Sequence, residues 1–382
     1  RMRTVLKILA KGIGFCAVML VLSILVCLAA GLVEFSGEET KVREVPQVYV
    51  VEPQEPGQDG EGEESPDSVQ DAEEQEATLL FAGDLFLTDL LQSKYNQQGI
   101  SAAASDSLLS VLREADIFML NEEFPFGTTG EPMEEKEYTF RVDPSYSTVL
   151  SELGVDIVTL ANNHMLDFGR GPLTETLNTL DQAGIAHVGA GENIDEAKAL
   201  KTFEMGGRTI GFLGASRVIP EHSWNASSGS SGLFTTYDAA ALAEQIQKAE
   251  ESCDFTVVYV HWGIEKNTQP EEYQKTLARQ YIDAGADAVI GAHPHVLQGI
   301  EFYQGKPIFY SLGNFIFSNG AYETMLVELT VGGTETEIRL IPCVSEANQM
   351  RLLEESAWPA FYQNLESLSF GITIGDDGTV SQ

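Results

Sequence analysis

Two histidines flank a single proline in the sequence Ala292-His293-Pro294-His295. Proline fixes φ, lacks an amide N–H and keeps its neighbour out of the helical region, so we expect a loop at the end of the apolar run that precedes it. In an extended segment residues i and i+2 point the same way, so both imidazoles could converge on one point. A shared metal ion needs such a pair, although two surface histidines are the ordinary alternative.

Five other apolar runs also end in polar side chains. In open α/β sheets the carboxyl ends of the strands share one edge, where ligands bind, so we expect these side chains to meet in one cleft. They are Asp84 after 78–83, Asn121-Glu122-Glu123 after 116–120, Asn162-Asn163-His164 after 155–161 with Asp167 three residues on, His261 after 255–260, and Asn314 after 308–312.

The types of these residues suit a hydrolytic metal centre. Carboxylates, an amide oxygen from Asn163 or Asn162, and imidazoles form a mixed set that favours Zn, Mn or Fe, and the absence of Cys at these ends predicts open coordination positions. Each residue alone could be a cap or a turn residue, but three His in this pattern favour a site. The predicted metal ligands are Asp84, Glu123, Asn163, His261, His293 and His295, whereas His187 and His222 are assigned structural roles.

The folded part is expected to start at Thr78, where apolar runs begin to alternate with helical patterns. This alternation predicts a layered α/β domain. The runs after Pro307 lack intervening helices and suggest antiparallel strands, while the Ser- and Gly-rich segment 216–237 suggests a mobile loop. Strands are expected at 78–83, 116–121, 155–161, 185–188, 209–214, 255–261, 287–291, 307–312, 325–330 and 336–341, and helices near 104–115, 144–153, 172–183, 238–251 and 271–284.

The N-terminal part predicts a membrane anchor. Four basic residues precede the uncharged segment 12–33, which is long enough to span a bilayer and should leave its basic end in the cytoplasm. A cleaved signal peptide is the main alternative, and a lipoprotein at Cys27 a weaker one, but the apolar run exceeds the usual length of about 7–15 residues. We therefore predict a single-pass cell-membrane protein with residues 1–35 as basic end and anchor, 36–77 as a disordered acidic linker, and an extracytoplasmic domain at 78–382 with its core at 78–343.

Charge and cysteine content exclude some classes of protein. The net charge is -36 and the pI is near 4.3, which argues against nucleic acid as a partner because phosphate binding needs an excess of Lys and Arg. Four Cys are too few for a disulfide framework in a chain of 382 residues. Cys253 and Cys343 are expected to be buried thiols rather than a pair.

The motifs together resemble a known family, the bacterial CapA-like proteins of poly-γ-glutamate capsule synthesis, which are similar to calcineurin-type metallophosphatases. The resemblance covers about residues 78–343 and extends toward Phe370. Its motifs are Gly83-Asp84, Asn121-Glu122-Glu123, Leu160-Ala161-Asn162-Asn163-His164 with Asp167 and Gly169, His261-Trp262-Gly263, Gly291-Ala292-His293-Pro294-His295, and Ser311-Leu312-Gly313-Asn314-Phe315.

This resemblance implies an α-β-β-α sandwich of metallophosphatase type. Asn163-His164 looks like the metallophosphatase pair in which Asn binds metal and His is a general acid, so His164 and Asp167 are the expected catalytic residues. The chain departs from that pattern at Phe86, where metallophosphatases have a histidine, and at Glu123, where they have an aspartate. The expected substrate-binding residues are Asn162, Asn314, Arg141 and Arg170, with Arg217 as a further cation.

The resemblance implies a metal-dependent hydrolase or transferase that acts on an anionic polymer such as poly-γ-glutamate, together with possible membrane partners in a capsule synthesis complex. A non-catalytic subunit that binds or exports the polymer is the alternative. The acidic balance of the chain would repel such a polymer except where a metal ion or an arginine compensates.

Overall fold

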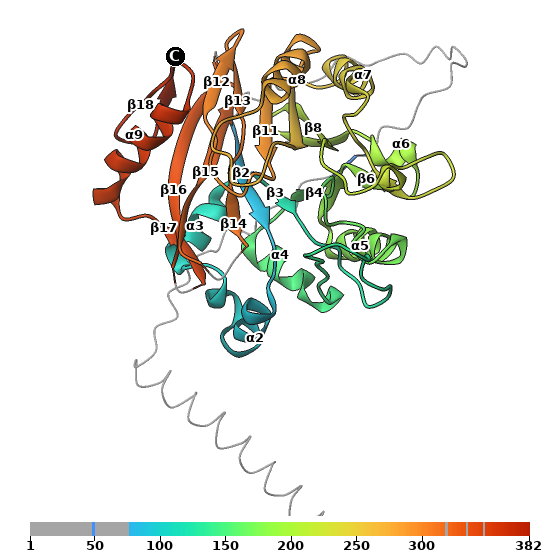
Figure 1. Cartoon of the computed structure of the whole chain (residues 1–382). Helices are drawn as coiled ribbons and strands as arrows, with labels where there is room; N and C mark the ends of the chain where they lie inside the picture. The colour runs from blue at the N-terminus through green and yellow to red at the C-terminus, as the bar shows by residue number, and fades with distance from the viewer. Residues whose placement is uncertain (1–47, 50–75, 318–319, 334, 347) are drawn as a thin grey trace, which may run out of the picture. The chain divides into compact units, whose positions relative to one another are not determined.

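The computed structural model describes residues 48–49, 76–317, 320–333, 335–346 and 348–382 (Figure 1). The expected anchor at 12–33 and most of the expected linker at 36–77 therefore lie outside the described residues. Within the described ranges, no helix has both the length and the apolar character that a membrane span requires.

The first of two large sheets has a parallel centre. Strands β8, β10, β11 and β13 run parallel to one another, and β7 and β12 pair antiparallel with β8 and β13. The spatial order is β1 (Val48–Tyr49), β7 (Lys201–Met205), β8 (Arg208–Ser216), β10 (Phe255–His261), β11 (Ala288–Ala292), β13 (Lys306–Phe309) and β12 (Ile300–Tyr303).

The second sheet is half parallel and half antiparallel. Strands β2 to β5 run parallel, while β15, β16 and β17 continue the sheet as antiparallel neighbours. The predicted antiparallel pairing after Pro307 is thus found at β15 and β16, whereas β13 pairs parallel with β11. The order is β17 (Gln349–Leu352), β16 (Glu337–Glu346), β15 (Tyr322–Val331), β2 (Ala77–Leu85), β3 (Ile117–Glu122), β4 (Ile157–Thr159) and β5 (Ala186–Val188), with β14 (Asn314–Ile316) also on β2. Two short ribbons pair β6 (Ala190–Gly191) with β9 (Gly232–Leu233), and β18 (Thr373–Ile374) with β19 (Val380–Ser381).

Helices begin and end where local sequence signals place them. Thr88, Ser105 and Asp238 accept hydrogen bonds from backbone N–H groups in the first turns of α2, α3 and α7, and Gly154 and Gly184 end α4 and α5 in the left-handed conformation. The helices are α2 (Asp89–Gln98), α3 (Asp106–Glu114), α4 (Ser147–Leu153), α5 (Arg170–Ala183), α6 (Ile194–Ala197), α7 (Ala239–Glu250), α8 (Glu272–Asp283) and α9 (Trp358–Leu368), with 3-10 turns η1 (Gly99–Ala102), η2 (Pro144–Tyr146), η3 (His222–Trp224) and η4 (Glu355–Ala357).

Alternating side chains of β2 show how the layers stack. Leu79 and Phe81 belong to a buried cluster with Phe212 and Tyr259 of the other sheet. Leu80 and Ala82 face the opposite way and join a cluster with residues of α3, α4 and α5. On the first sheet, Val258 and Val260 join a third cluster with α7 and α8, which cover the outer face of that sheet (Figure 1). The result is the predicted order of helix, sheet, sheet and helix layers.

Three parts of the fold differ from the expectations. Segment 216–237 is packed rather than loose, because Trp224, Leu233 and Phe234 are buried. The core continues past residue 343, since α9 contributes to the cluster between the sheets. Within the expected linker, β1 forms a short strand against β7, so this part of 36–77 has secondary structure. Cys253 and Cys343 are both free, and Cys343 is the buried one.

Gly83 allows the closest approach between β2 and the segment that leads to β14. A Cβ atom built at this position would lie 1.8 Å from the Gly313 carbonyl oxygen, in a place where both backbones are fixed by pairing. We expect Gly83→Ala to lower the free energy of unfolding by about 3 kcal/mol, the upper range for overpacking a core. Chemical denaturation would measure this, with Gly229→Ala as the control because a Cβ there meets open space. Equal stability of the two variants would contradict the proposed constraint.

Candidate metal centre

The predicted site residues meet where the parallel strands of both sheets end. Asp84 is the second-last residue of β2, Glu123 follows β3, and His261 ends β10, while the loop after β11 carries His293 and His295. The two sheets meet here because the His293 amide donates to Asp84 Oδ2 at 3.3 Å, and His261 Nε2 lies 3.5 Å from Glu123 Oε1. The convergence of these strand ends is thus confirmed.

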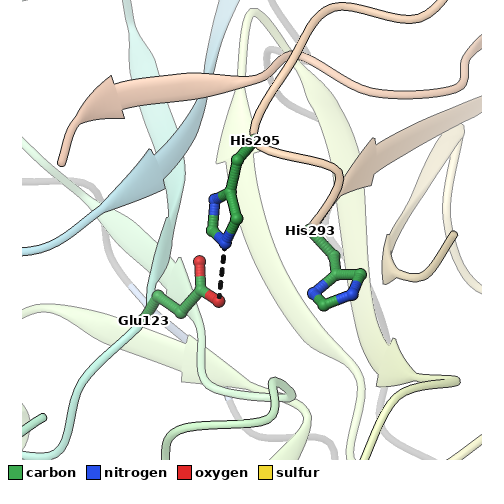
Figure 2. Close-up of side chains that lie close together, drawn as sticks. All are labelled: Glu123, His293 and His295. Atoms are coloured by element: carbon green, nitrogen blue, oxygen red, sulfur yellow. Dashed lines mark ion pairs between the residues drawn. The ribbon is translucent and has the colours of Figure 1, made fainter. Parts of the chain in front are cut away.

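Two overlapping groups of ligand atoms lie at these strand ends. One comprises Glu123, His293 and His295 (Figure 2), the other Asp84, Glu123 and His261, and within each group the ligand atoms lie within 4.8 Å of one another. His295 Nε2 points toward Glu123 Oε1 at 3.9 Å, and its Nδ1 lies 3.1 Å from Asp84 Oδ2. Glu123 is therefore the shared member of the cluster.

Two buried atoms of the cluster indicate that its residues fit a cation. Glu123 Oε1 and His293 Nδ1 make no hydrogen bond with any described residue although both are buried. A buried polar atom without a partner costs about 1–3 kcal/mol. A divalent ion bound between these side chains would satisfy both atoms, and the nitrogen and oxygen donor set suits Zn, Mn or Fe.

The His293-Pro294-His295 loop is not extended. His293 has φ 97° and His295 has φ 56°, so both adopt the left-handed region that side chains disfavour. Such residues cost about 1–3 kcal/mol each and persist where the surroundings hold them. The imidazole centroids lie 5.9 Å apart. The two rings do converge, but through a strained turn rather than through the alternation of an extended strand.

The residues around the imidazoles fix which nitrogen faces the cluster. His295 Nδ1 lies 2.8 Å from Asn314 Oδ1, so this nitrogen carries the donated proton and Nε2 is left toward Glu123. His261 Nε2 lies 2.7 Å from Asn163 Oδ1, which places the predicted amide ligand directly beside it. Asn121, which is not among the predicted metal ligands, donates to Asp84 Oδ1 at 2.8 Å and to Glu123 Oε2 at 3.4 Å.

Burial sets the protonation of the cluster. It lowers the pKa of His261 well below its ordinary value and that of His293 to about 3, and the neighbouring histidines add to both effects. For His295 burial acts in the same direction, but the Asp84 carboxylate outweighs it and raises the pKa. Burial, followed by the Asp84 charge, raises the pKa of Glu123 well above its ordinary value. Burial thus favours the neutral forms of His261, His293 and Glu123, whereas the Asp84 carboxylate favours the protonated form of His295.

His164 and Asp167 form a buried pair beside the cluster. His164 Nδ1 lies 2.7 Å from Asp167 Oδ2, and because a carboxylate only accepts, Nδ1 carries the proton. The ring of Phe140 stacks on the imidazole with centroids 3.9 Å apart, and Phe86 stacks in turn on Phe140 at 4.0 Å. No described residue bonds to His164 Nε2, which leaves that nitrogen available. Asp167 acts through His164 and is a positioning residue.

Lys136 completes this pair, and the sequence analysis missed it. Its ammonium group donates to Asp167 Oδ1 and lies 3.1 Å from His164 Nδ1, with only 15% of the side chain exposed. It also lies over the ring of Trp224, 5.3 Å from the centroid. The residue comes from a segment with four glutamates between Glu131 and Glu137, where a single lysine looks like solvent-exposed charge. Only the contacts of Lys136 in the folded structure identify it as part of the site.

The structure gives the four expected substrate-binding residues internal partners. Asn162 is fully buried and donates to Asn121 Oδ1 and to the Glu122 carbonyl. Asn314 orients His295, as described above. Arg141 donates to the Thr129 and Gly130 carbonyls and lies over the Phe168 ring, and Arg170 donates to the Ser223 carbonyl. These side chains hold loops in place, because backbone carbonyls without another donor attract guanidinium groups.

Glu122, between two site residues in sequence, faces away from them. Its side chain is fully buried and neither carboxyl oxygen has a hydrogen-bond partner among the described residues. Burial raises the pKa of this carboxyl well above its ordinary value. His187 and His222 lie outside the cluster, beside Asp181 and Asn225 respectively, in agreement with their structural assignment.

Residues 78–319 match the family described as bacterial capsule synthesis protein PGA_cap. The chain belongs to this family. The matched range contains the metal cluster, Lys136 and the His164–Asp167 pair, whereas β16, β17, α9 and the two last strands lie beyond it. The PGA_cap region therefore includes the entire candidate centre.

Three curated relatives carry names from capsule or polymer synthesis. The chain is 32% identical over 241 residues to "PGA biosynthesis protein CapA" of Bacillus subtilis (strain 168), covering 62% of this chain and 63% of the relative. It is 30% identical over 266 residues to "Capsule biosynthesis protein CapA" of Bacillus anthracis, covering 66% and 62%. A "Probable polyglutamine synthesis accessory protein" of Mycobacterium tuberculosis (strain ATCC 25618 / H37Rv) is 32% identical over 211 residues, covering 53% and 55%. The chain thus spans less than two thirds of each of these relatives.

Solved structures resemble this chain only distantly. The 5′-nucleotidase from Candida albicans SC5314 aligns with a TM-score of 0.36 and 12% identity, covering 69% of this chain and 51% of that one. This likeness is too low to bear on the chemistry of the PGA_cap chain.

Metal affinity is expected to fall on acidification, beginning above pH 6.5. His261 and His293, whose pKa values are lowered, already have the neutral form that a metal needs, so they do not oppose binding. His295 has a pKa raised above its ordinary 6.5, and its proton must leave before a metal binds. Glu123, also raised, must lose a proton as well. Competition titrations of Zn²⁺ between about pH 5.5 and 8.5 would measure the decline. His295→Gln should remove the part of this decline that occurs at the highest pH. An affinity that stays constant down to pH 6 would refute the role of His295 as a ligand that must lose a proton.

Proposed function

We propose that the chain is a metal-dependent hydrolase or transferase that acts on an anionic polymer, with poly-γ-glutamate as the substrate class. The observation that carries this proposal is the placement of an acid pair, His164 and Asp167, beside a cluster of buried metal-ligand types. Asn163, the residue before His164, has its Oδ1 2.7 Å from His261 Nε2, which places the pair next to the cluster. The names of the relatives concern capsule and PGA synthesis, which supports this polymer class.

A metal ion would supply Lewis-acid polarisation of the scissile carbonyl or phosphoryl group. The residues that would hold it are Asp84, Glu123, His261, His293 and His295, with Asn163 beside His261. Metal ligands at the strand ends, as in metallophosphatases, would agree with the four-layer architecture and with the donor types. The identity of the ion is left open between Zn, Mn and Fe.

His164 would protonate the leaving group from Nε2. Asp167 holds the Nδ1 proton and so fixes the tautomer and the ring orientation. Burial lowers the pKa of His164, which makes its charged form a stronger proton donor. Lys136 neutralises part of the Asp167 charge and so limits the increase in His164 basicity that this carboxylate would cause. A positioned proton donor typically contributes 10²–10⁴-fold to a rate.

One observation favours a second function, a non-catalytic subunit that binds or exports the polymer. Phe86 stands two residues after Asp84, at the position where the resemblance to metallophosphatases implies a histidine ligand, and it packs into the aromatic stack with Phe140. A reduced ligand set is compatible with a site that binds metal or polymer without turnover.

Replacing His164 separates these two functions. In the purified 382-residue chain, His164→Ala should keep most of its metal and lose roughly 10²–10⁴-fold of its activity on poly-γ-glutamate, because it removes the acid and leaves the ligands. The double variant His293→Ala, His295→Ala should lose metal as well, measured by elemental analysis. His222→Ala, an exposed histidine outside the cluster, is the control. Stoichiometric metal in the double variant would reject the ligand assignment, and activity unaffected by His164→Ala would reject the catalytic role.

We also propose that segment 12–33 anchors the chain in the membrane, with the folded domain outside the cell and in reach of capsule synthesis partners. Support comes from the basic residues before this apolar segment and from their absence within it. Protease added to intact protoplasts should then remove the domain. Complete protection would exclude this topology, and a mature chain beginning near Gly31 would replace the anchor with a cleaved signal.

A further inference from the structure

A second hollow lies next to the metal cluster, on the side of the first sheet that carries helices. We call it the Arg217 hollow. It has a volume of about 350 Å³ and is lined by Arg217, Thr236 and Tyr237 together with Glu272, Tyr273 and Gln280 of α8. None of the functional assignments above uses this cavity. Its lining combines one guanidinium group with two phenol rings.

The sheet places this hollow beside the cluster. Ser216, the last residue of β8, pairs in register with His261 of β10, and the amide of Arg217 donates to the His261 carbonyl at 2.8 Å. The Gly263 amide donates to the Tyr273 hydroxyl at 2.6 Å, which ties α8 to the residues just after His261. Neighbouring strands lie about 4.8 Å apart, so Arg217 is one strand away from a predicted metal ligand.

The guanidinium group of Arg217 is held by ring stacking rather than by a carboxylate. Its central carbon lies 4.5 Å from the Tyr237 ring centroid and 5.7 Å from that of Tyr273. Nη1 donates to the Thr236 carbonyl at 3.0 Å, while Nε and Nη2 have no acceptor among the described residues. Stacking occupies the faces of a guanidinium group and leaves the N–H groups at its edge available for a bidentate carboxylate.

The lack of an acidic partner for Arg217 is informative because the chain as a whole is strongly acidic. With a net charge of -36, carboxylates are abundant, and Arg279, Arg339 and Arg351 each pair with a glutamate. The Glu272 carboxylate, which also lines the hollow, pairs with Lys275 at 2.8 Å and not with Arg217. Arg217 is thus stacked on two aromatic rings and has no acidic partner among the described residues, at the ligand-binding edge of the sheet.

Two buried hydroxyl groups near the hollow could form further hydrogen bonds. Thr236, which lines it, is fully buried, and its Oγ1 makes no regular hydrogen bond with the described residues. The buried Tyr281 hydroxyl also lacks one, although Thr236 is close enough to influence its pKa. Polar atoms of this kind are costly to bury without a partner, and a water or ligand oxygen would satisfy them.

We propose that the Arg217 hollow is a carboxylate subsite that holds a glutamyl unit of the polymer beside the unit at the metal cluster. In a γ-linked glutamate chain the amide bonds use the γ-carboxyl groups, so each unit carries a free α-carboxylate, the group that the edge of Arg217 fits. The identity of the polymer rests on the proposed function, whereas the recognition of a carboxylate rests on the contacts of Arg217 alone. Such a subsite would explain how a strongly acidic chain binds an anionic polymer.

Calorimetry with a γ-glutamyl tetramer and the purified 382-residue chain tests the subsite. Arg217→Gln should weaken binding by about 10- to 100-fold, the range for losing hydrogen bonds to a charged group. Arg217→Lys should recover only part, because lysine keeps the charge and loses the planar fork. The same tetramer with α-carboxamides should bind the unaltered chain as weakly as the acid form binds Arg217→Gln. Arg113→Gln, which removes an arginine bonded to the Glu152 carbonyl, is the control for lost charge.

Tyr237 provides a variant that should leave folding intact, since the residue is 53% exposed. Tyr237→Ala should weaken tetramer binding several-fold and Tyr237→Phe should not, because the ring and not the hydroxyl stacks on Arg217. Equal tetramer binding by the unaltered chain and Arg217→Gln, or no binding by the unaltered chain, would overturn the proposal. Arg217-dependent binding without any turnover would instead reject the hydrolase and leave the subsite standing. Persistence of that binding in the His293→Ala, His295→Ala variant would support the separation of the two sites.

Discussion

The burial of Asp84 and Glu123 side by side is the constraint on which the rest of the site depends. Both side chains are fully buried, and like charges at close range oppose each other's ionisation. The Asn121 amide donates to both carboxylates and His295 Nδ1 lies 3.1 Å from Asp84 Oδ2, but Glu123 Oε1 still has no hydrogen-bond partner among the described residues. Such an arrangement is expensive for an apolar core and favourable around a cation. The strand ends of two sheets, the strained histidine loop and the stacked aromatic rings all hold side chains around this one point.

Much of this organisation follows from local sequence patterns. Many strands and helices between Thr78 and Ile341 were predictable because apolar periodicity and cap residues agree with each other there, as at Ser105 and Gly184, whereas α2, β7 and β12 were not predicted. Convergence of Asp84 with Glu123 was predictable from one rule, that parallel strands of a sheet end at a common edge, whereas His261 reaches them from the other sheet. These residues are close in space because of the order and direction of the strands. The alternation of strand and helix patterns in the sequence predicts that order and direction.

The remainder depended on contacts that a single sequence does not reveal. Lys136 reaches His164 from a glutamate-rich segment whose composition suggests only solvation. Arg141 and Arg170 carry the charge expected of a polymer site, yet both donate to loop carbonyls, and Arg170 Nη1 is buried without a hydrogen-bond partner among the described residues. Arg217 also donates to a carbonyl, that of Thr236, but its guanidinium group lies over two tyrosine rings that line a hollow. Residue type therefore identifies candidates, and the competition for hydrogen-bond partners decides among them. The packing of Trp224 in a Ser- and Gly-rich segment has a similar origin, since a few buried apolar side chains outweigh the local composition.

The donor set is divided between the two sheets. Asp84 and Glu123 come from the second sheet, whereas His261, His293 and His295 come from the first. An ion bound to both would act as a cross-link between the two halves of the sandwich, and it could not bind the unfolded chain in the same way. By mass action, the folded state would then gain RT ln(1 + [ion]/Kd), about 2.7 kcal/mol at a hundredfold excess over Kd. The midpoint of thermal unfolding would become a function of the free ion concentration, so that the surroundings of the protein and not its sequence alone would determine how firmly the sheets stay together.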